Sequence, residues 1–254
     1  MTFSLSIWYA TLALELLLLI RALNGAFLRK YAVFYVYVGW VLALSSARLI
    51  IYLAEPAYYR AFYWHSQPLS VLVGCGVLWE IYRQALAGYP GAARMARNVL
   101  LFSVVMVFSK ILVKAWTDSG WRIAETTAEL ERNMRVVQAI LLIALVLILA
   151  QYAIPLGRNL KGMILGYGFF IGTSVINLTF RLFLGDSFQK WWQYLQPIFY
   201  LAVLSVWCWA LWSYQAAPLP ATEPKIEEDY QLLATRTRKS LLFIRAYLGR
   251  AIRS

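Results

Sequence analysis

The sequence predicts an all-helical protein that crosses a membrane seven times. Of its 254 residues, 61% are hydrophobic and only 14% are charged, whereas a soluble domain has about a quarter charged residues. The apolar residues form runs of about 20, long enough to cross a hydrocarbon core of roughly 30 Å as helices. No regular alternation at period two occurs, which disfavours an outer-membrane barrel. The 11 Trp and 17 Tyr residues are typical of aromatic belts at both membrane boundaries.

Each predicted span is an apolar run that ends at a charged, Pro-containing or aromatic connection. The first run ends before Arg21, the second before Glu55, and the fourth before Asp118. Such polar breaks between runs of membrane length separate one crossing from the next. The seven predicted spans are residues 4–20, 31–53, 68–86, 98–116, 133–154, 161–184 and 197–214.

Every second connection between these spans is basic, and the other connections carry most of the acidic residues. Because an excess of Lys and Arg marks the cytoplasmic side, we expect the N-terminus outside and the C-terminus inside. The formal net charge of +12 therefore indicates membrane orientation, and we expect no nucleic-acid partner. The basic connections contain Arg21, Arg29, Lys30, Arg83, Arg94, Arg97, Arg158 and Lys161.

Two stretches, 39–68 and 172–197, contain the same features in the same order. In each, the first Gly is followed nine residues later by an Arg-Leu pair, at Arg48 and at Arg181. An aromatic connection and a Gln-Pro pair that opens the next span come after it. The two copies have the same predicted direction, which gives a parallel repeat of three spans, a linker span and three spans, an arrangement found in transporters. The alternative is that helix ends reuse the same residue types without a duplication.

Basic and polar side chains inside the spans are the candidate binding residues, because charges at membrane depth are costly and usually face the bundle interior or water. Helical periodicity places Ser45 beside Arg48 in the second span. It likewise places Gln138 beside Arg135 in the fifth span. By the predicted orientation, the basic groups lie in the outer half of the membrane. The candidate ligand-binding residues are Arg48, Lys110, Lys114, Arg135, Asn177 and Arg181.

Such a cationic cluster repels itself unless something relieves it, and the sequence leaves three solutions open. The side chains could snorkel to the outer boundary, or an anionic ligand or lipid headgroup could bind among them. Since Lys110 lies deepest, the ligand hypothesis depends mainly on Lys110 and Arg48. In the third solution, acidic residues of the outer connections cover the cluster: Glu125, Glu129, Glu131 or Asp186.

Two acidic residues lie in spans on the predicted inner side. Glu80 is one helical turn from Arg83 and Gln84, which predicts a local pair. Glu15 has no such neighbour. Because carboxyl groups at membrane depth can form proton relays, both are candidates for that role.

The sequence contains no pattern that indicates catalysis. His65 is its one histidine, Cys75 and Cys208 lie in separate apolar spans as expected free thiols, and no cluster has metal-ligand spacing. Hydrolase, protease and nucleotide-binding motifs do not occur. We therefore expect no enzymatic activity, no cofactor and no metal.

The chain divides into a membrane domain, residues 1–214, a Pro-rich linker, 215–226, and a terminal helix, 227–254. This last segment begins with acidic residues and ends with basic ones, as suits a helix dipole, and its apolar residues recur at helical spacing. A basic amphipathic helix of this kind can lie on the anionic inner leaflet. The alternative is that it binds a cytoplasmic or membrane protein partner.

Two segments carry a resemblance to known proteins. One, 130–170, contains Arg132, Arg135 and Gln138 and continues through Arg158 to Gly162-Met-Ile-Leu-Gly166. The other, 63–82, contains Trp79-Glu80-Ile81. They resemble a group of uncharacterised seven-span integral membrane proteins of acidobacterial genomes. The resemblance covers the second to seventh spans, and it implies a multi-pass protein of a bacterial inner membrane but no activity.

These observations support three hypotheses of function. The first is a non-enzymatic, receptor-like or accessory protein that binds a small anionic or lipid-like ligand in its outer half, in contact with membrane lipids. The second is a small-solute transporter built from the three-span repeats. The third is an accessory subunit of a larger membrane complex.

Overall fold

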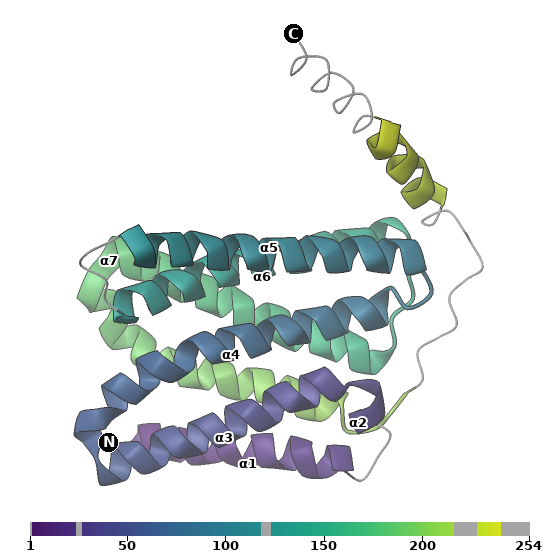
Figure 1. Cartoon of the computed structure of the whole chain (residues 1–254). Helices are drawn as coiled ribbons and strands as arrows, with labels where there is room; N and C mark the ends of the chain where they lie inside the picture. The colour runs from purple at the N-terminus through teal and green to yellow at the C-terminus, as the bar shows by residue number, and fades with distance from the viewer. Residues whose placement is uncertain (1, 24–26, 118–122, 216–227, 240–254) are drawn as a thin grey trace.

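A computed structural model describes residues 2–23, 27–117, 123–215 and 228–239 of the chain (Figure 1). The regular structure of these residues is entirely helical. A short helix also covers residues 228–239 of the terminal segment, and the rest of that segment and most of the linker lie outside the described residues. The elements are α1 (Thr2–Leu23), α2 (Phe27–Lys30), α3 (Ala32–Ala54), α4 (Pro56–Ala85), α5 (Pro90–Thr117), α6 (Ile123–Gln151) and α7 (Arg158–Ala210).

Four of the helices are long and apolar enough to cross a membrane, which indicates a membrane protein. Large apolar side chains on their outer faces are exposed, such as Phe102 at 65% and Leu147 at 63%. A soluble monomer rarely exposes such a surface, whereas lipid covers it in a membrane. The four candidate spans are Leu5–Leu23, Ala32–Ala54, Pro90–Lys114 and Thr126–Gln151.

Helix α7 folds back on itself. A straight helix of its 53 residues would be about 80 Å long, but its two ends lie against each other (Figure 1). Asn159 Nδ2 donates a hydrogen bond of 2.7 Å to the carbonyl oxygen of Ala210. Toward the bend, the rings of Phe180 and Phe188 stack with centroids 5.6 Å apart. We call residues 158–180 the first arm and residues 188–210 the second arm.

Glycines allow the close approach of these two arms. A Cβ atom at Gly162 would overlap the Cβ of Ala210, and one at Gly166 would overlap the indole of Trp207. Small residues at these two positions therefore let the arms pack closely, as is typical of membrane helices.

The helices form a ring around a buried centre. Helix α1 packs against α3 and α7, α3 against α4, α4 against α6, and α6 against α7. The hydrogen bond from the Tyr200 hydroxyl to Glu15 places the second arm on α1. The first arm faces α6, because the Arg135 guanidinium lies over the Phe170 ring, and it reaches α4, because the Tyr167 hydroxyl donates to the Gly74 carbonyl at 2.6 Å. Helix α5 lies outside the ring, against α4 and α6.

The expectation of an aromatic loop before each Gln-Pro pair is wrong, and neither pair begins a helix. Pro68 lies inside α4 and Pro197 inside α7, and the aromatic segments before them are helical rather than loops. A proline leaves the carbonyl four residues earlier without its helical partner. In α4 that carbonyl belongs to Trp64, and the Thr127 hydroxyl of α6 donates to it at 3.4 Å. A neighbouring helix can thus satisfy the freed group, as is common in membrane helices.

Candidate ligand-binding site

Arg48 lies near the C-terminal end of α3 and has no carboxylate partner among the described residues. Its Nη2 donates hydrogen bonds of 2.9 Å to Ser66 Oγ and 3.0 Å to Gln67 Oε1, both on α4. The guanidinium carbon lies 4.5 Å from the centre of the Tyr63 ring. Its Nε is buried and has no hydrogen-bond partner in the described part of the chain. The side chain is therefore held in place, but its charge and part of its donor capacity remain available.

An open cleft of about 400 Å³ lies beside this guanidinium. Its walls come from the N-terminal half of α1, the C-terminal half of α3, the start of α4 and the second arm of α7. Because Pro197 has no N–H, the Gln193 carbonyl in this wall lacks its usual helical donor. One cation, Arg48, therefore shares this space with hydroxyls, amides and aromatic rings. The cleft is lined by Ile7, Trp8, Thr11, Ser45, Arg48, Tyr59, Gln193, Gln196, Pro197 and Tyr200.

Glu15 contacts this cleft through Tyr200. The Tyr200 hydroxyl donates a hydrogen bond of 2.7 Å to Glu15 Oε1, and Glu15 is only 1% exposed. Its other oxygen, Oε2, is buried without a partner in the described ranges. On α1, Glu15 follows Thr11 by one turn, so it lies one turn farther from the N-terminal end than the cleft wall does.

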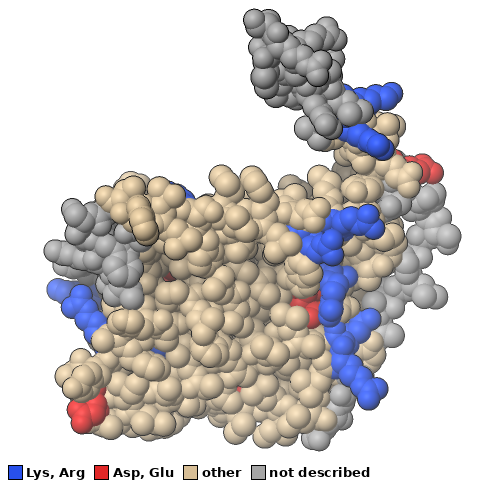
Figure 2. Space-filling view, in the orientation of Figure 1, with Lys and Arg blue, Asp and Glu red and all other residues tan. Residues whose placement is uncertain are grey.

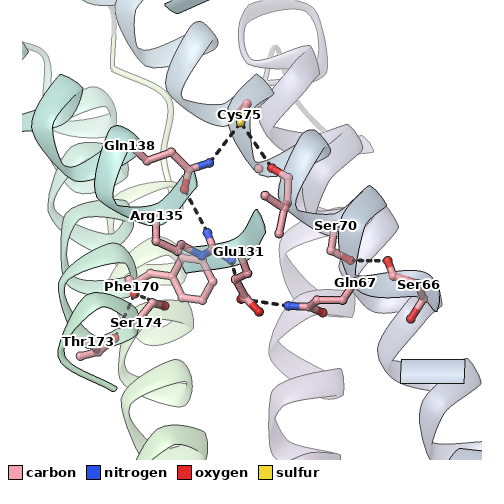
Figure 3. Close-up of polar contacts among 12 residues, drawn as sticks. Ser66, Gln67, Ser70, Cys75, Glu131, Arg135, Gln138, Phe170, Thr173 and Ser174 are labelled. Carbon is pink, nitrogen blue, oxygen red and sulfur yellow. Dashed lines mark hydrogen bonds and ion pairs between the residues drawn. The ribbon is translucent and has the colours of Figure 1, made fainter. Parts of the chain in front are cut away.

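From Gln67, which accepts a hydrogen bond from Arg48, a chain of polar contacts leads to the centre of the ring (Figure 3). Gln67 Nε2 donates to Glu131 Oε1 at 2.9 Å, and this oxygen lies 3.6 Å from Arg135 Nη2. Arg135 Nη1 then donates to Gln138 Oε1 at 3.2 Å, and Gln138 Nε2 lies 3.2 Å from the Cys75 sulfur. Arg135 is only 4% exposed. Its charge is balanced by Glu131, which also accepts the hydrogen bond that fixes Gln67.

Lys110 and Lys114 do not line the cleft. On α5 they share one acidic partner, Glu129 of α6: Lys110 Nζ lies 3.2 Å from Glu129 Oε1, and Lys114 forms an ion pair with Oε2. Both lysine side chains are at least half exposed. Glu129 and Glu131 lie on α6, which begins at Ile123, rather than in a loop. Of the three solutions to the cationic cluster, the geometry favours coverage by acidic residues for every described cation except Arg48.

Asn177 and Glu80 do not line the cleft. Asn177 is on the first arm, and its Oδ1 is buried without a partner in the described structure. Arg181 belongs to the helical backbone of α7, but its side chain lies outside the described residues. Glu80 forms the expected local pair: Arg83 Nη2 lies 2.5 Å and Gln84 Nε2 2.9 Å from its Oε1. Its Oε2 accepts a further hydrogen bond from a backbone N–H of α3, so Glu80 is fully satisfied.

Sequence reasoning missed most residues of the cleft wall. Gln196 of the cleft wall and Gln67, the hydrogen-bond partner of Arg48, belong to the two Gln-Pro pairs, but nothing in the sequence assigned either glutamine to the site. Thr11, Tyr59 and Tyr200 gave no signal, because isolated hydroxyls and rings are common in membrane helices. Tyr63 and Tyr59 lie at the start of α4, before the predicted span, and burial raises the pKa of Tyr63 to about 12. The Tyr63 ring therefore stays neutral beside Arg48.

Comparisons of the chain with protein-family models, with curated proteins and with solved structures found no match. Among the described residues, no group of three or more His, Cys, Asp and Glu side chains could hold a metal ion.

Proposed function

We propose that this protein binds a small organic anion in the cleft at Arg48, from the non-cytoplasmic side of a bacterial inner membrane. The observation that carries the proposal is a fixed guanidinium with no carboxylate partner in the described structure, facing an open cleft of about 400 Å³. This volume is within the range of about 300–1,000 Å³ that is typical of small-ligand sites.

The other groups of the wall restrict the chemistry of the ligand. Guanidinium groups bind carboxylates with paired N–H donors, and Arg48 lines the cleft while its hydrogen bonds to Ser66 and Gln67 use Nη2 alone. Ser45 and Thr11 offer hydroxyls, Gln193 and Gln196 offer amides, and Tyr59 offers a ring face. A small carboxylate with hydroxyl groups or an apolar part matches this combination better than a simple inorganic ion.

The membrane orientation rests on the distribution of charge. In this proposal, α1, α3, α4, α5, α6 and the two arms of α7 are the seven crossings, with the N-terminus outside. Exposed basic side chains gather at the end of the bundle where α2 and the α4–α5 connection lie (Figure 2), which supports that end as the cytoplasmic one. They include Arg29, Lys30, Arg83, Arg94 and Arg97.

A receptor-like or accessory role is supported by the terminal helix. At the end of α6, the Tyr152 hydroxyl donates a hydrogen bond of 3.0 Å to Asp229 Oδ2 of the terminal helix. Helix α6 also carries Glu131, which contacts the polar chain from Arg48. A ligand that moves Arg48 and Gln67 would therefore act on the same helix that contacts the cytoplasmic segment, which could bind the inner leaflet or a protein partner.

Transport of the anion is the second candidate function. In the three-one-three repeat, α1, α3 and α4 correspond to α6 and the two arms of α7, with α5 as the linker. Since α4 corresponds to the second arm and α1 to α6, the contact of α4 with α6 corresponds to the contact of the second arm with α1. Helix α5 lies outside the ring, as suits a linker. Glu15 lies one helical turn from Thr11 of the cleft wall, and its Oε2 has no partner among the described residues. It is the group that proton coupling would use.

Ligand-induced stabilisation of the purified protein tests the anion site. The probes are acetate, succinate and lactate as carboxylates, with chloride at equal ionic strength as the reference. A ligand at about 100 times its dissociation constant stabilises a protein by about 2.7 kcal/mol. We expect at least one carboxylate to raise the thermal midpoint of the native protein and of Arg60→Gln, an exposed control at the same end, but not of Arg48→Gln. Equal effects on Arg48→Gln and Arg60→Gln would contradict the proposal, as would no effect of any carboxylate.

A further inference from the structure

A second cavity, of about 260 Å³, lies at the opposite end of the bundle, between α4 and α5. Three arginines line it together with Trp79: Arg83 from α4, and Arg94 and Arg97 from the first turns of α5. Arg83 is paired with Glu80. Arg94 and Arg97 are exposed and form no ion pair within the described ranges, so the cavity carries an uncompensated positive charge.

An apolar groove of about 340 Å³ continues from this cavity. Tyr82 and Ala96 line both spaces, so the two are adjacent. The groove runs between α4, α5 and α6, with Leu86, Val99 and Ile148 among its walls. Leu233 of the terminal helix also contributes to it. Met95 and Val99 are 52% and 41% exposed, so one side of the groove is open to the surroundings of the bundle.

A basic cavity joined to an apolar groove matches a molecule with an anionic headgroup and an apolar chain. Arginines on the cytoplasmic side of helix pairs bind phosphate headgroups, and an apolar groove along a membrane helix accommodates an acyl chain. We infer that this protein binds an anionic phospholipid at α4–α5, with the phosphate at Arg94 and Arg97 and one acyl chain in the groove along Val99 and Ile148.

Two features distinguish this ligand from related ones. A zwitterionic lipid would bring a cation toward arginines that already lack acidic partners in the described structure, so an anionic headgroup is favoured. Free phosphate would use the arginines but leave the groove empty. The site lies at the other end of the bundle from the Arg48 cleft, and the inference does not depend on a ligand at that cleft.

Native mass spectrometry of the full chain, released from detergent, tests this inference. The probes are phosphatidylglycerol, phosphatidylcholine with the same acyl chains, and inorganic phosphate. The variants are Arg94→Gln with Arg97→Gln, which removes the basic pair, and Ala96→Leu, which fills the wall shared by the two spaces. The control is Arg29→Gln with Lys30→Gln, which removes the same charge from α2 at the same end of the bundle.

We expect the native protein to retain phosphatidylglycerol in preference to phosphatidylcholine. Loss of two arginines should weaken phosphatidylglycerol binding by about 30-fold, at about fivefold for each charge, while the α2 control stays near the native value. Ala96→Leu should weaken phosphatidylglycerol binding without changing any retention of inorganic phosphate. Equal losses in the α2 control would show general surface attraction and overturn the inference. Unchanged binding in Ala96→Leu, or phosphate binding as strong as lipid binding, would also overturn it.

Discussion

Tyr200 donates its hydroxyl hydrogen bond to Glu15 across 2.7 Å, although the two residues are 185 positions apart in the chain. The bond joins the second arm of α7 to α1 and completes the ring of helices. It also connects the wall of the cleft to Glu15, a buried acidic residue.

Removing the Tyr200 hydroxyl should destabilise the protein, because it leaves Glu15 buried with no partner among the described residues. We expect Tyr200→Phe to lower the free energy of unfolding by about 1–3 kcal/mol, measured by thermal or SDS-induced unfolding in detergent. Glu15→Gln keeps an acceptor oxygen for Tyr200 and should cost less. Tyr194→Phe is the control on the same arm, since Tyr194 is 54% exposed. A loss in Tyr194→Phe equal to that in Tyr200→Phe would contradict the assigned role.

Arg135, which is buried, and Glu131, whose side chain is 17% exposed, form an ion pair at the centre of the polar chain. Removing one partner leaves the other charge uncompensated, which typically costs about 3–5 kcal/mol. We therefore expect Arg135→Gln to be strongly destabilising in the same unfolding assay. The double variant Arg135→Gln with Glu131→Gln should be less destabilised than the sum of the two single variants. Additive losses would show that the two side chains do not interact.

The packing of the two arms of α7 depends on Gly162. Because a Cβ there would overlap Ala210, Gly162→Ala should separate the arms and destabilise the protein by about 1–3 kcal/mol. Gly172→Ala is a matched control on the same arm, since nothing lies within 4 Å of a Cβ at that position. It should be neutral or slightly stabilising, because Ala favours a helix. Similar effects of the two changes would argue against the hairpin.

Local patterns predicted much of the fold. All seven predicted spans fall on helices, apart from a few residues at their ends. The pairing of Glu80 with Arg83 also follows from neighbours along the chain. Such features depend on hydropathy, helical periodicity and residue size, which a single sequence contains.

What sequence reasoning missed depends on partners far away in the chain. Pro68 lies inside α4, and the Thr127 hydroxyl that reaches the carbonyl it frees belongs to α6. The expected cationic cluster is divided because Glu129 and Glu131 lie on α6, facing different neighbours. No spacing along the chain reports which helices are adjacent, so Arg48 could not be recognised as the one described cation of that set without an acidic partner.

The reactivity of a thiol placed beside Arg48 tests the central claim most directly. In a protein whose Cys75 and Cys208 are replaced by Ser and Ala, Ser45→Cys would be treated from the non-cytoplasmic side with a sulfonate-bearing and with a trimethylammonium-bearing methanethiosulfonate. For each reagent, the rate with Ser45→Cys is divided by its rate with a free thiol. We predict that this ratio is larger for the anionic reagent than for the cationic one. Adding Arg48→Gln should lower this preference about fivefold, the effect of about 1 kcal/mol from one nearby charge, whereas adding Arg60→Gln should not. A thiol that reacts only from the cytoplasmic side, or shows no preference for the anion, would contradict an anion-binding cleft at Arg48.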